Sequence, residues 1–143
     1  MNPYHNKLEV SVRAIIEDRG RILVCRMKKK GYYFFPGGHL KFGERLNEAL
    51  KRELKEELGV SLQKFSFMGV VDNIFMDDGE KHHEFILAFR AKVKGVHSDS
   101  REDHIDFTFL SKKDFAKNKI YPIALKKATL KWLKDKKIFW VSQ

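Results

Sequence analysis

The sequence predicts one domain of mixed α and β structure, and its length and hydrophobic patterning support this prediction. The chain has 143 residues, the usual size of a single domain, and no internal repeat or Pro/Gly/Ser-rich linker divides it. Helical spacing predicts helices at 47–58 and 122–135. Mixed strands with a few helices are typical of an α+β fold or a mixed-sheet sandwich. Runs of β-branched or alternating apolar residues predict strands at 8–18, 21–27, 65–75, 84–93 and 105–109.

The composition indicates a globular protein of the cell interior. Hydrophobic residues make up 43% of the chain and charged residues 34%, which is enough apolar material for one core. The longest apolar stretches fall far short of the roughly 20 residues that a membrane span needs, and the N-terminus lacks the apolar segment of a signal peptide. Cys25 is the only cysteine, which excludes a disulfide framework and a cysteine-based zinc site. We therefore expect a cytoplasmic location and no membrane partner.

The chain is strongly basic, with 29 lysines and arginines against 19 acidic residues and a net charge of +10. Such a charge attracts polyanions, so the phosphates of a nucleotide and an RNA are both candidate partners. It is also typical of a solvated, lysine-rich surface, because many of the lysines are scattered or lie near the C-terminus. The charge therefore favours an anionic substrate without identifying it.

Local signals predict the ends of several elements in the second half of the chain. Asp77-Asp78-Gly79 predicts a hairpin turn between the strands at 65–75 and 84–93. Ser111 can cap a short helix. The tail at 138–141 either adds a last strand or packs down onto the domain.

The predicted helix at 47–58 has a clear apolar face. Asn47 can cap its start, and Gly59 occupies the position after a helix end that favours glycine. At about 100° per residue, the leucines of this segment form one stripe, which we expect to be buried. This stripe comprises Leu46, Leu50, Leu54 and Leu58.

Three glutamates, Glu53, Glu56 and Glu57, lie together on one flank of this stripe, within an arc of about 100°. Carboxylates crowded at these spacings repel one another and destabilise a helix. Divalent cations among them would make the arrangement favourable, and oxygen ligands of this kind select Mg²⁺ or Mn²⁺. Gly37 and Gly38 precede the helix and let the backbone approach a ligand closely, so a glycine carbonyl can serve as a further oxygen ligand.

A fixed pattern of residues runs from Gly38 to Val60. It consists of Gly38, five residues, Glu44, seven residues and then Arg52-Glu53-Leu54-x-Glu56-Glu57-x-Gly59-Val60. This pattern resembles the complete Nudix box, and none of its 23 residues departs from it. The rest of the chain resembles the Nudix family more loosely, because its strands and its later helix follow in the family's order.

The resemblance implies a fold, an activity and a metal site. Nudix hydrolases share an α/β/α sandwich with a mixed β-sheet, and they cleave a nucleoside diphosphate linked to another group X. The resemblance implies dependence on Mg²⁺, for which Mn²⁺ can substitute. Arg52 would hold a box glutamate in place, and Glu44 would support the loop or the residues around the metal ligands. The implied metal ligands are Glu53, Glu56, Glu57 and the carbonyl of Gly37 or Gly38.

Acidic and histidine residues outside the box also need an interpretation. The general base of the family is a box glutamate or an acidic residue on a distant loop, and Glu102 lies on a predicted loop of that kind. His82, His83 and Glu84 could suggest a metal triad. Neighbouring residues on a strand point to opposite faces, however, so we expect structural or substrate-contact roles for them.

Three further side chains are candidates for binding the substrate. Arg26 precedes the basic loop at 28–30 and can meet phosphates, although a solvated loop explains it as well. Tyr33 belongs to the aromatic run at 32–35, where it can stack on a nucleobase or pack in the core. His39 lies in the box loop, where it can touch phosphate or stay exposed.

The predicted activity is hydrolysis of a phosphoanhydride bond in a small nucleotide. The segment at 75–78, after the box, has neither the proline that resembles the ADP-ribose subgroup nor the tyrosine that resembles the diadenosine-polyphosphate subgroup. A nucleoside triphosphate is therefore the first choice of substrate by elimination. Hydrolysis at RNA 5′ ends is the runner-up. The alternative from another class is a non-catalytic nucleotide-sensing module, whose expected signature is a broken box. We expect a monomer or homodimer and no DNA partner.

Overall fold

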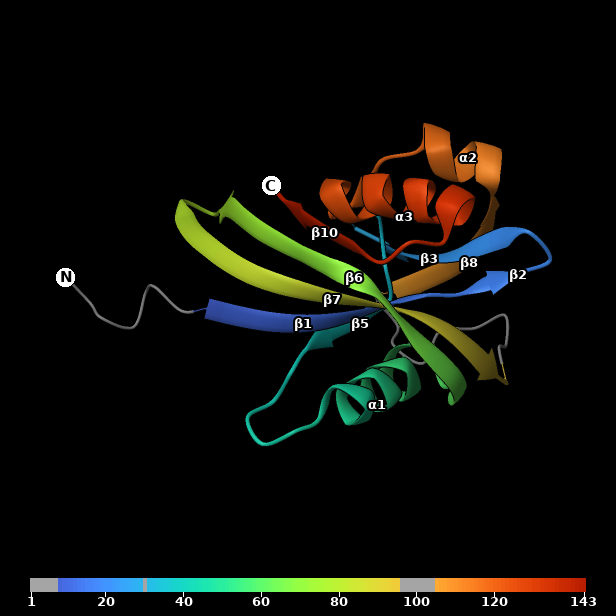
Figure 1. The fold of residues 1–143 in the computed structure, drawn as a ribbon, viewed down its shortest axis with the longest axis horizontal. Helices are drawn as coiled ribbons and strands as arrows, with labels where there is room; N and C mark the ends of the chain where they lie inside the picture. Colours follow the sequence, from blue (N-terminus) through green and yellow to red (C-terminus); the bar gives the residue numbers. More distant parts are fainter. Residues whose placement is uncertain (1–7, 30, 96–104) are drawn as a thin grey trace.

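The computed structural model describes residues 8–29, 31–95 and 105–143 and arranges them as two β-sheets between helices (Figure 1). Helix α1 covers one face of the sheets, while α2 and α3 lie on the other (Figure 1). Both sheets contain parallel and antiparallel pairs of strands. This architecture confirms the predicted α/β/α sandwich with mixed sheets. The helices are α1 (Leu46–Leu58), α2 (Lys112–Lys117) and α3 (Ile123–Asp135).

Strand β1 lies inside the first sheet, which has the order β10-β6-β7-β1-β5. Its strands are β1 (Leu8–Ile15), β5 (Gly37–His39), β6 (Ser61–Asp77), β7 (Glu80–Lys94) and β10 (Phe139–Ser142). The second sheet has the order β2-β3-β4-β9, and β8 pairs with β3. Its strands are β2 (Glu17–Asp18), β3 (Arg21–Met27), β4 (Tyr33–Phe34), β8 (Ile105–Ser111) and β9 (Ile120–Tyr121). The strand that enters the box, β5, is therefore paired directly with β1.

Two apolar cores lie on opposite faces of the sheets, and single strands contribute to both. On β3, Leu23 and Cys25 belong to the core beneath α1, while Ile22 and Val24 belong to the core beneath α3. All four side chains are fully buried. Successive side chains of a strand point to opposite faces, which explains how one strand fills both cores. The cysteine is thus a core residue, as its apolar surroundings in the sequence predict.

Strands β6 and β7 form a long antiparallel hairpin around Asp78-Gly79. The φ angles of these two residues are 52° and 80°, a conformation that two-residue hairpin turns require and that glycine adopts without strain. The predicted turn is confirmed, and both strands extend beyond the predicted ranges. The register of the hairpin sets Asn73 opposite Glu84.

Three features differ from the sequence predictions. The helix α1 begins at Leu46, so Asn47 is not its cap. Arg45 occupies that position, and its backbone N–H donates at 3.0 Å to the carboxylate of Glu48, the third residue of the helix, as in a capping box. Leu46 is 36% exposed and does not belong to the buried stripe. The segment at 8–18 forms two strands, β1 and β2, because the chain passes there from one sheet to the other.

The C-terminal third follows the predictions more closely. Ser111 caps α2, because its hydroxyl accepts the Asp114 N–H at 3.1 Å. The tail forms β10, which pairs in parallel with β6. None of the helices in the described part of the chain has the length and apolar character to cross a bilayer.

Candidate active site

Helix α1 positions the box glutamates because its buried face fixes its rotation about its axis. Most of its residues are good helix formers, and it ends at Gly59, whose φ of 68° is left-handed. Leu50, Leu54 and Leu58 are buried in the core beneath the helix. The flank beside this buried face therefore points toward β5.

Two glycines of β5 make room for this flank, each for a different reason. Gly37 has a φ of 142°, and a Cβ there would lie 2.0 Å from the carbonyl oxygen of Val12 on β1. At Gly38, a Cβ would lie 2.5 Å from the carboxylate of Glu53. Backbone packing therefore requires glycine at position 37, whereas the glutamate side chain requires it at position 38.

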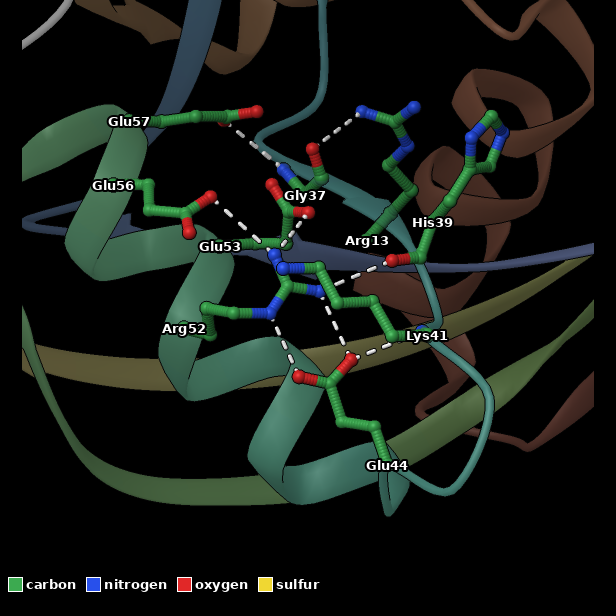
Figure 2. Close-up of polar contacts among 9 residues, drawn as sticks. All are labelled: Arg13, Gly37, His39, Lys41, Glu44, Arg52, Glu53, Glu56 and Glu57. Atoms are coloured by element: carbon green, nitrogen blue, oxygen red, sulfur yellow. Dashed lines mark hydrogen bonds and ion pairs between the residues drawn. The ribbon is translucent and has the colours of Figure 1, made fainter.

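Arg52 connects the carboxylates of the box (Figure 2). Its Nε and Nη2 donate to the two oxygens of Glu44 at 2.7 and 2.9 Å. Its Nη1 donates to Glu53 at 2.8 Å and to Glu56 at 3.3 Å. Its Nη2 also reaches the carbonyl oxygen of His39 at 3.1 Å. One guanidinium thus holds three carboxylates and the loop backbone, which its planar fork of donors allows.

The pair formed by Arg52 and Glu44 is largely shielded from solvent. Their side chains are 21% and 14% exposed. The pKa of Glu44 is lowered from 4.5 to about 2, mainly by the hydrogen bonds from Arg52 and also by the one from the Lys41 backbone N–H, against the opposing effect of burial. The hydrogen bond to Glu44 in turn raises the pKa of Arg52. Both groups are therefore charged near neutral pH.

The remaining box glutamates differ in their surroundings. Glu57 is 8% exposed, and its carboxylate accepts the Gly37 N–H at 3.2 Å. The side chain of Glu56 is 50% exposed. Figure 2 shows Glu53 and Glu57 directed toward the glycine backbone and Glu56 farther from it. Two of the three predicted metal ligands therefore meet the Gly37 segment directly.

The donors at this place fit a hard divalent cation. Glu53, Glu57 and the Gly37 carbonyl offer carboxylate and carbonyl oxygens, which Mg²⁺ and Mn²⁺ prefer. The Gly37 oxygen also accepts from Arg13 Nη1 at 3.2 Å, and a carbonyl oxygen has a second lone pair. The Glu53 carboxylate lies where a Cβ at position 38 would project, so only glycine there leaves this ligand in place.

A cavity of about 570 Å³ opens beside the Gly37 segment. Gly37 and Glu57 line it, so it adjoins the box. Its volume is typical of small-molecule sites, which span about 300–1,000 Å³. Most of its other walls are apolar and come from both sheets and from the start of α3. They include Tyr32, Phe34, Phe75, Tyr121 and Ile123.

The three residues predicted to bind substrate do not line this cavity. Arg26 is exposed on β3 and pairs with Asp106 at 3.5 Å. Tyr33 is half-buried and packs against the core beneath α3. The side chain of His39 is 62% exposed, and its ring points away from the box glutamates (Figure 2). Their substrate contacts stay predictions, and Glu102 lies outside the described residues.

Sequence reasoning missed two polar residues of the cavity and gave a third only a general role. Arg13 on β1 and Asn73 on β6 are new, while Glu84 on β7 was expected to have a structural or substrate-contact role. Asn73 and Glu84 are 5% and 7% exposed. The available signal was the interruption of apolar strands by buried polar residues. Such residues need a specific partner, so they often mark a site.

Residues 6–133 match the family model described as NUDIX domain. The chain belongs to the Nudix family. This confirms the family that the box pattern predicts. Nudix proteins are pyrophosphohydrolases, and they generally need a divalent metal.

Nudix relatives of this chain carry different names. An ADP-ribose pyrophosphatase from Methanocaldococcus jannaschii is 33% identical over 97 residues, which cover 66% of this chain and 56% of that protein. An 8-oxo-dGTP diphosphatase from Buchnera aphidicola is 40% identical over 60 residues, or 39% of this chain and 46% of that protein. The nucleoside triphosphatase NudI of Escherichia fergusonii is 29% identical over 131 residues, or 83% of this chain and 93% of that protein. The alignment thus spans about half the length of the first two relatives and most of NudI.

The fold is that of solved Nudix structures. A MutT protein from Bacillus halodurans matches with a TM-score of 0.78, covering 92% of this chain and 86% of that chain. The two sequences are 19% identical, so this likeness concerns the fold alone.

Proposed function

We propose that this Nudix protein is a Mg²⁺-dependent pyrophosphohydrolase that acts on a nucleoside triphosphate. The observation that carries the proposal is the position of Gly37 and Glu57 in the lining of the cavity. Predicted metal ligands thereby form one end of a pocket whose other walls are mainly apolar and aromatic. Such a pocket suits a nucleotide with its phosphates at the glutamates and its base among the aromatic rings.

The metal would be held by Glu53, Glu56, Glu57 and the Gly37 carbonyl. When bound, Mg²⁺ supplies charge neutralisation at the phosphates and a water of lowered pKa. Arg52 keeps the glutamates oriented before a substrate arrives, which limits the reorganisation that the reaction requires.

Other residues of the chain complete the proposed site. Arg13 lines the cavity beside Gly37 and offers a guanidinium to phosphate oxygens. The proton acceptor is either a box glutamate or Glu102. Of the box glutamates, Glu57 is the one whose side chain lines the cavity.

One observation supports a nucleoside triphosphate as the substrate, and a second supports a nucleotide in general. The NudI relative, named a nucleoside triphosphatase, aligns over 93% of its length. In the cavity wall, Tyr32 and Tyr121 pair edge to face with their ring centroids 5.0 Å apart. Aromatic surfaces of this kind stack on nucleobases with little sequence preference.

Product identification tests the proposal. The full chain is incubated with Mg²⁺ and, separately, with nucleoside triphosphates, nucleoside diphosphates, ADP-ribose, nucleotide sugars and dinucleotide polyphosphates. We expect the highest kcat/KM with a triphosphate, and the products separated by chromatography to be a monophosphate and pyrophosphate. EDTA should abolish turnover, and Mg²⁺ or Mn²⁺ should restore it. Turnover that persists without a divalent metal would refute the mechanism.

The distribution of lysines favours a second candidate, hydrolysis at RNA 5′ ends. Residues 105–143 contain ten lysines and three aspartates, so this part of the chain carries most of the net charge of +10. The start of α3, at Pro122 and Ile123, forms part of the cavity wall, which places this basic region next to the site. A polyanion longer than a nucleotide could therefore extend over it.

Salt dependence separates the two candidates. Each phosphate contact of an RNA releases counterions, so RNA affinity should fall steeply between low and moderate salt. Replacing Lys127 and Lys131, both exposed on α3, with glutamine should weaken this dependence and leave triphosphate turnover unchanged. A flat salt response with 5′-triphosphate RNA would favour the small nucleotide.

A further inference from the structure

A second cluster of metal-binding residue types lies on three adjacent strands. It consists of Glu9 on β1, His39 on β5 and Glu84 on β7, whose ligand atoms all lie within 4.8 Å of one another. The register explains this meeting, because Glu9 is paired with Glu84 and Ser11 is paired with His39. Residues 9 and 11 share one face of β1, so the three side chains of the cluster meet on that face of the sheet.

The cluster is distinct from the box. Val12 and Ala14 of β1 face the core beneath α1, so the alternate residues, including Glu9, face away from that helix. His39 contacts both regions. Its carbonyl oxygen accepts a hydrogen bond from Arg52 of the box, while its ring points away from the box glutamates (Figure 2). The box glutamates 53, 56 and 57 therefore come from α1 and the cluster's glutamates from β1 and β7, although Glu57 and Glu84 line the same cavity.

The carboxylates of this cluster lack a lysine or arginine partner among the described residues. Glu84 is 7% exposed, and its carboxylate accepts a hydrogen bond from the Ser11 hydroxyl. Glu9 faces His39 Nε2 at 3.7 Å and His82 Nδ1 at 3.6 Å. In the part of the chain that the structure describes, no lysine or arginine forms an ion pair with either glutamate. A buried carboxylate next to another is unfavourable unless a cation joins them.

An independent observation at the same place also indicates a cation. Asn73 stands opposite Glu84 and shares its face of the sheet. It is 5% exposed, and its Oδ1 is buried without a hydrogen-bond partner among the described residues. Arg13, on the same face of β1, donates through Nη1 to the carbonyl oxygens of Phe35 and Gly37. Asn73 Oδ1 is therefore a buried oxygen without a hydrogen-bond donor, which a cation beside Glu84 would satisfy, while Arg13 Nε on the same face is a buried donor without an acceptor among the described residues.

We propose that Glu9, His39 and Glu84 bind a divalent transition-metal ion. Two carboxylates with an imidazole nitrogen suit Zn²⁺ or Mn²⁺ better than a cation that takes oxygen ligands alone. Ligand atoms bound at about 2.1 Å lie at most about 4.2 Å apart, so small side-chain rotations would close the set. His82 is stacked on Phe75 with ring centroids 5.0 Å apart, and from there it orients Glu9.

Such an ion would connect the box loop to the cavity wall. His39 directly follows the two glycines of the box, and Glu84 lines the cavity. An ion bound to both residues would tether the end of β5 to β1 and β7. The expected consequence is a protein whose melting temperature rises with Zn²⁺ even when the box cannot hold metal.

Titration of the full chain with Co²⁺ tests the proposal. The titration is made in a Glu53→Gln, Glu57→Gln parent, so that the box contributes little to binding. We expect saturable binding with a visible absorption band of nitrogen-ligated Co²⁺, and a higher melting temperature with Zn²⁺. Adding Glu9→Gln or His39→Ala should weaken Co²⁺ binding by about 10-fold or more, since even supporting residues of metal sites contribute that much.

His83→Ala is the matched control. His83 follows His82 in sequence but lies on the other face of β7, where its Nε2 contacts Asp72 at 2.7 Å. The control should bind Co²⁺ as the parent does. His39 is well exposed, so its replacement leaves the fold intact, which circular dichroism checks. Equal Co²⁺ affinity in the parent and in both ligand variants would overturn the proposal. Because no substrate is present, this result is independent of the proposed hydrolysis.

Discussion

The box and the cluster of Glu9, His39 and Glu84 both gather carboxylates beside β5, but their charges are balanced differently. In the box, Arg52 donates to three carboxylates at 2.7–3.3 Å. In the second cluster, the glutamates face two histidines and the Ser11 hydroxyl. The guanidinium of arginine donates to several carboxylate oxygens in a fixed fork, whereas a histidine offers at most one donor from each ring nitrogen. The box is thus ordered by the protein itself, while order in the second cluster depends on its ligand.

The largest expected effect comes from removing a carboxylate from the ordered box. Glu53→Gln should lower kcat by about 100-fold or more, because it removes a predicted metal ligand that Arg52 already orients. Glutamine has nearly the same helix propensity as glutamate, so the free energy of unfolding should change little. Steady-state kinetics and urea unfolding measure both. Glu48→Gln, at the start of α1, is the control and should keep wild-type turnover. Wild-type kcat in Glu53→Gln would show that the box does not take part in the reaction.

Arg52→Lys tests whether the arginine is the source of that order. Lysine keeps the charge but cannot donate in a fixed fork to Glu44 and Glu53 together. We expect kcat to fall by about 10–100-fold, with a higher metal concentration needed for half-maximal activity. Lys51→Arg, on the exposed side of the helix, is the control, because it exchanges one basic residue for another at the position next to Arg52. Unchanged kinetics in Arg52→Lys would mean that a point charge is enough.

The two glycines of β5 should respond differently to alanine. In Gly37→Ala the new Cβ meets the Val12 carbonyl oxygen, and the φ of 142° disfavours any side chain, so we expect a loss of about 2–4 kcal/mol in unfolding free energy. In Gly38→Ala the Cβ meets the flexible end of Glu53, which can move aside. Stability should then fall by less than about 1 kcal/mol while kcat falls. Thermal unfolding and kinetics on both variants would reveal the contrast, and equal losses of stability would contradict it.

The smallest effect concerns Glu44 in acid. Its pKa is about 2 in the folded protein against an ordinary 4.5, so the unfolded chain binds this proton more tightly. Its contribution to stability is therefore complete above about pH 5 and is lost as the pH falls toward 2. Glu44→Gln should be less stable than wild type at pH 6, and the difference should shrink toward pH 2. A difference in urea midpoints that stays constant over this range would show that the Arg52 bond does not cause the shift.

The box site could be predicted because its geometry is local. One helix and the loop before it contain all the predicted ligands, and helical periodicity together with the leucine stripe sets the direction of Glu53 and Glu57. The same local signals predicted the Asp78-Gly79 turn and the Ser111 cap. They failed for the start of α1, where Arg45 is the cap residue and its backbone N–H donates to the Glu48 carboxylate.

Residues that meet across strands could not be predicted from local signals. Glu9, His39 and Glu84 lie far apart in the chain, and only the order β7-β1-β5 and its register bring them together. The cavity wall has the same origin, since Asn73 and Tyr121 come from elements distant in sequence. Pairing of this kind depends on tertiary packing, which periodicity does not encode. Glu102 lies outside the described residues, so the distant base stays a prediction from the sequence.

The side chains of β1 alternate between the two faces of the sheet, and this has a consequence for engineering the ligand preference of the pocket. Val12 and Ala14 face the core beneath α1, whereas Ser11 and Arg13 face the other way, toward the pocket side. Substitutions at Ser11 and Arg13 would alter the shape and polarity of the ligand site without disturbing the core residues beneath α1. The ligand site and the core that supports α1 are thus encoded at interleaved positions of one strand. A mutant library limited to the pocket-facing positions would therefore change the ligand site while the core beneath α1 keeps its packing.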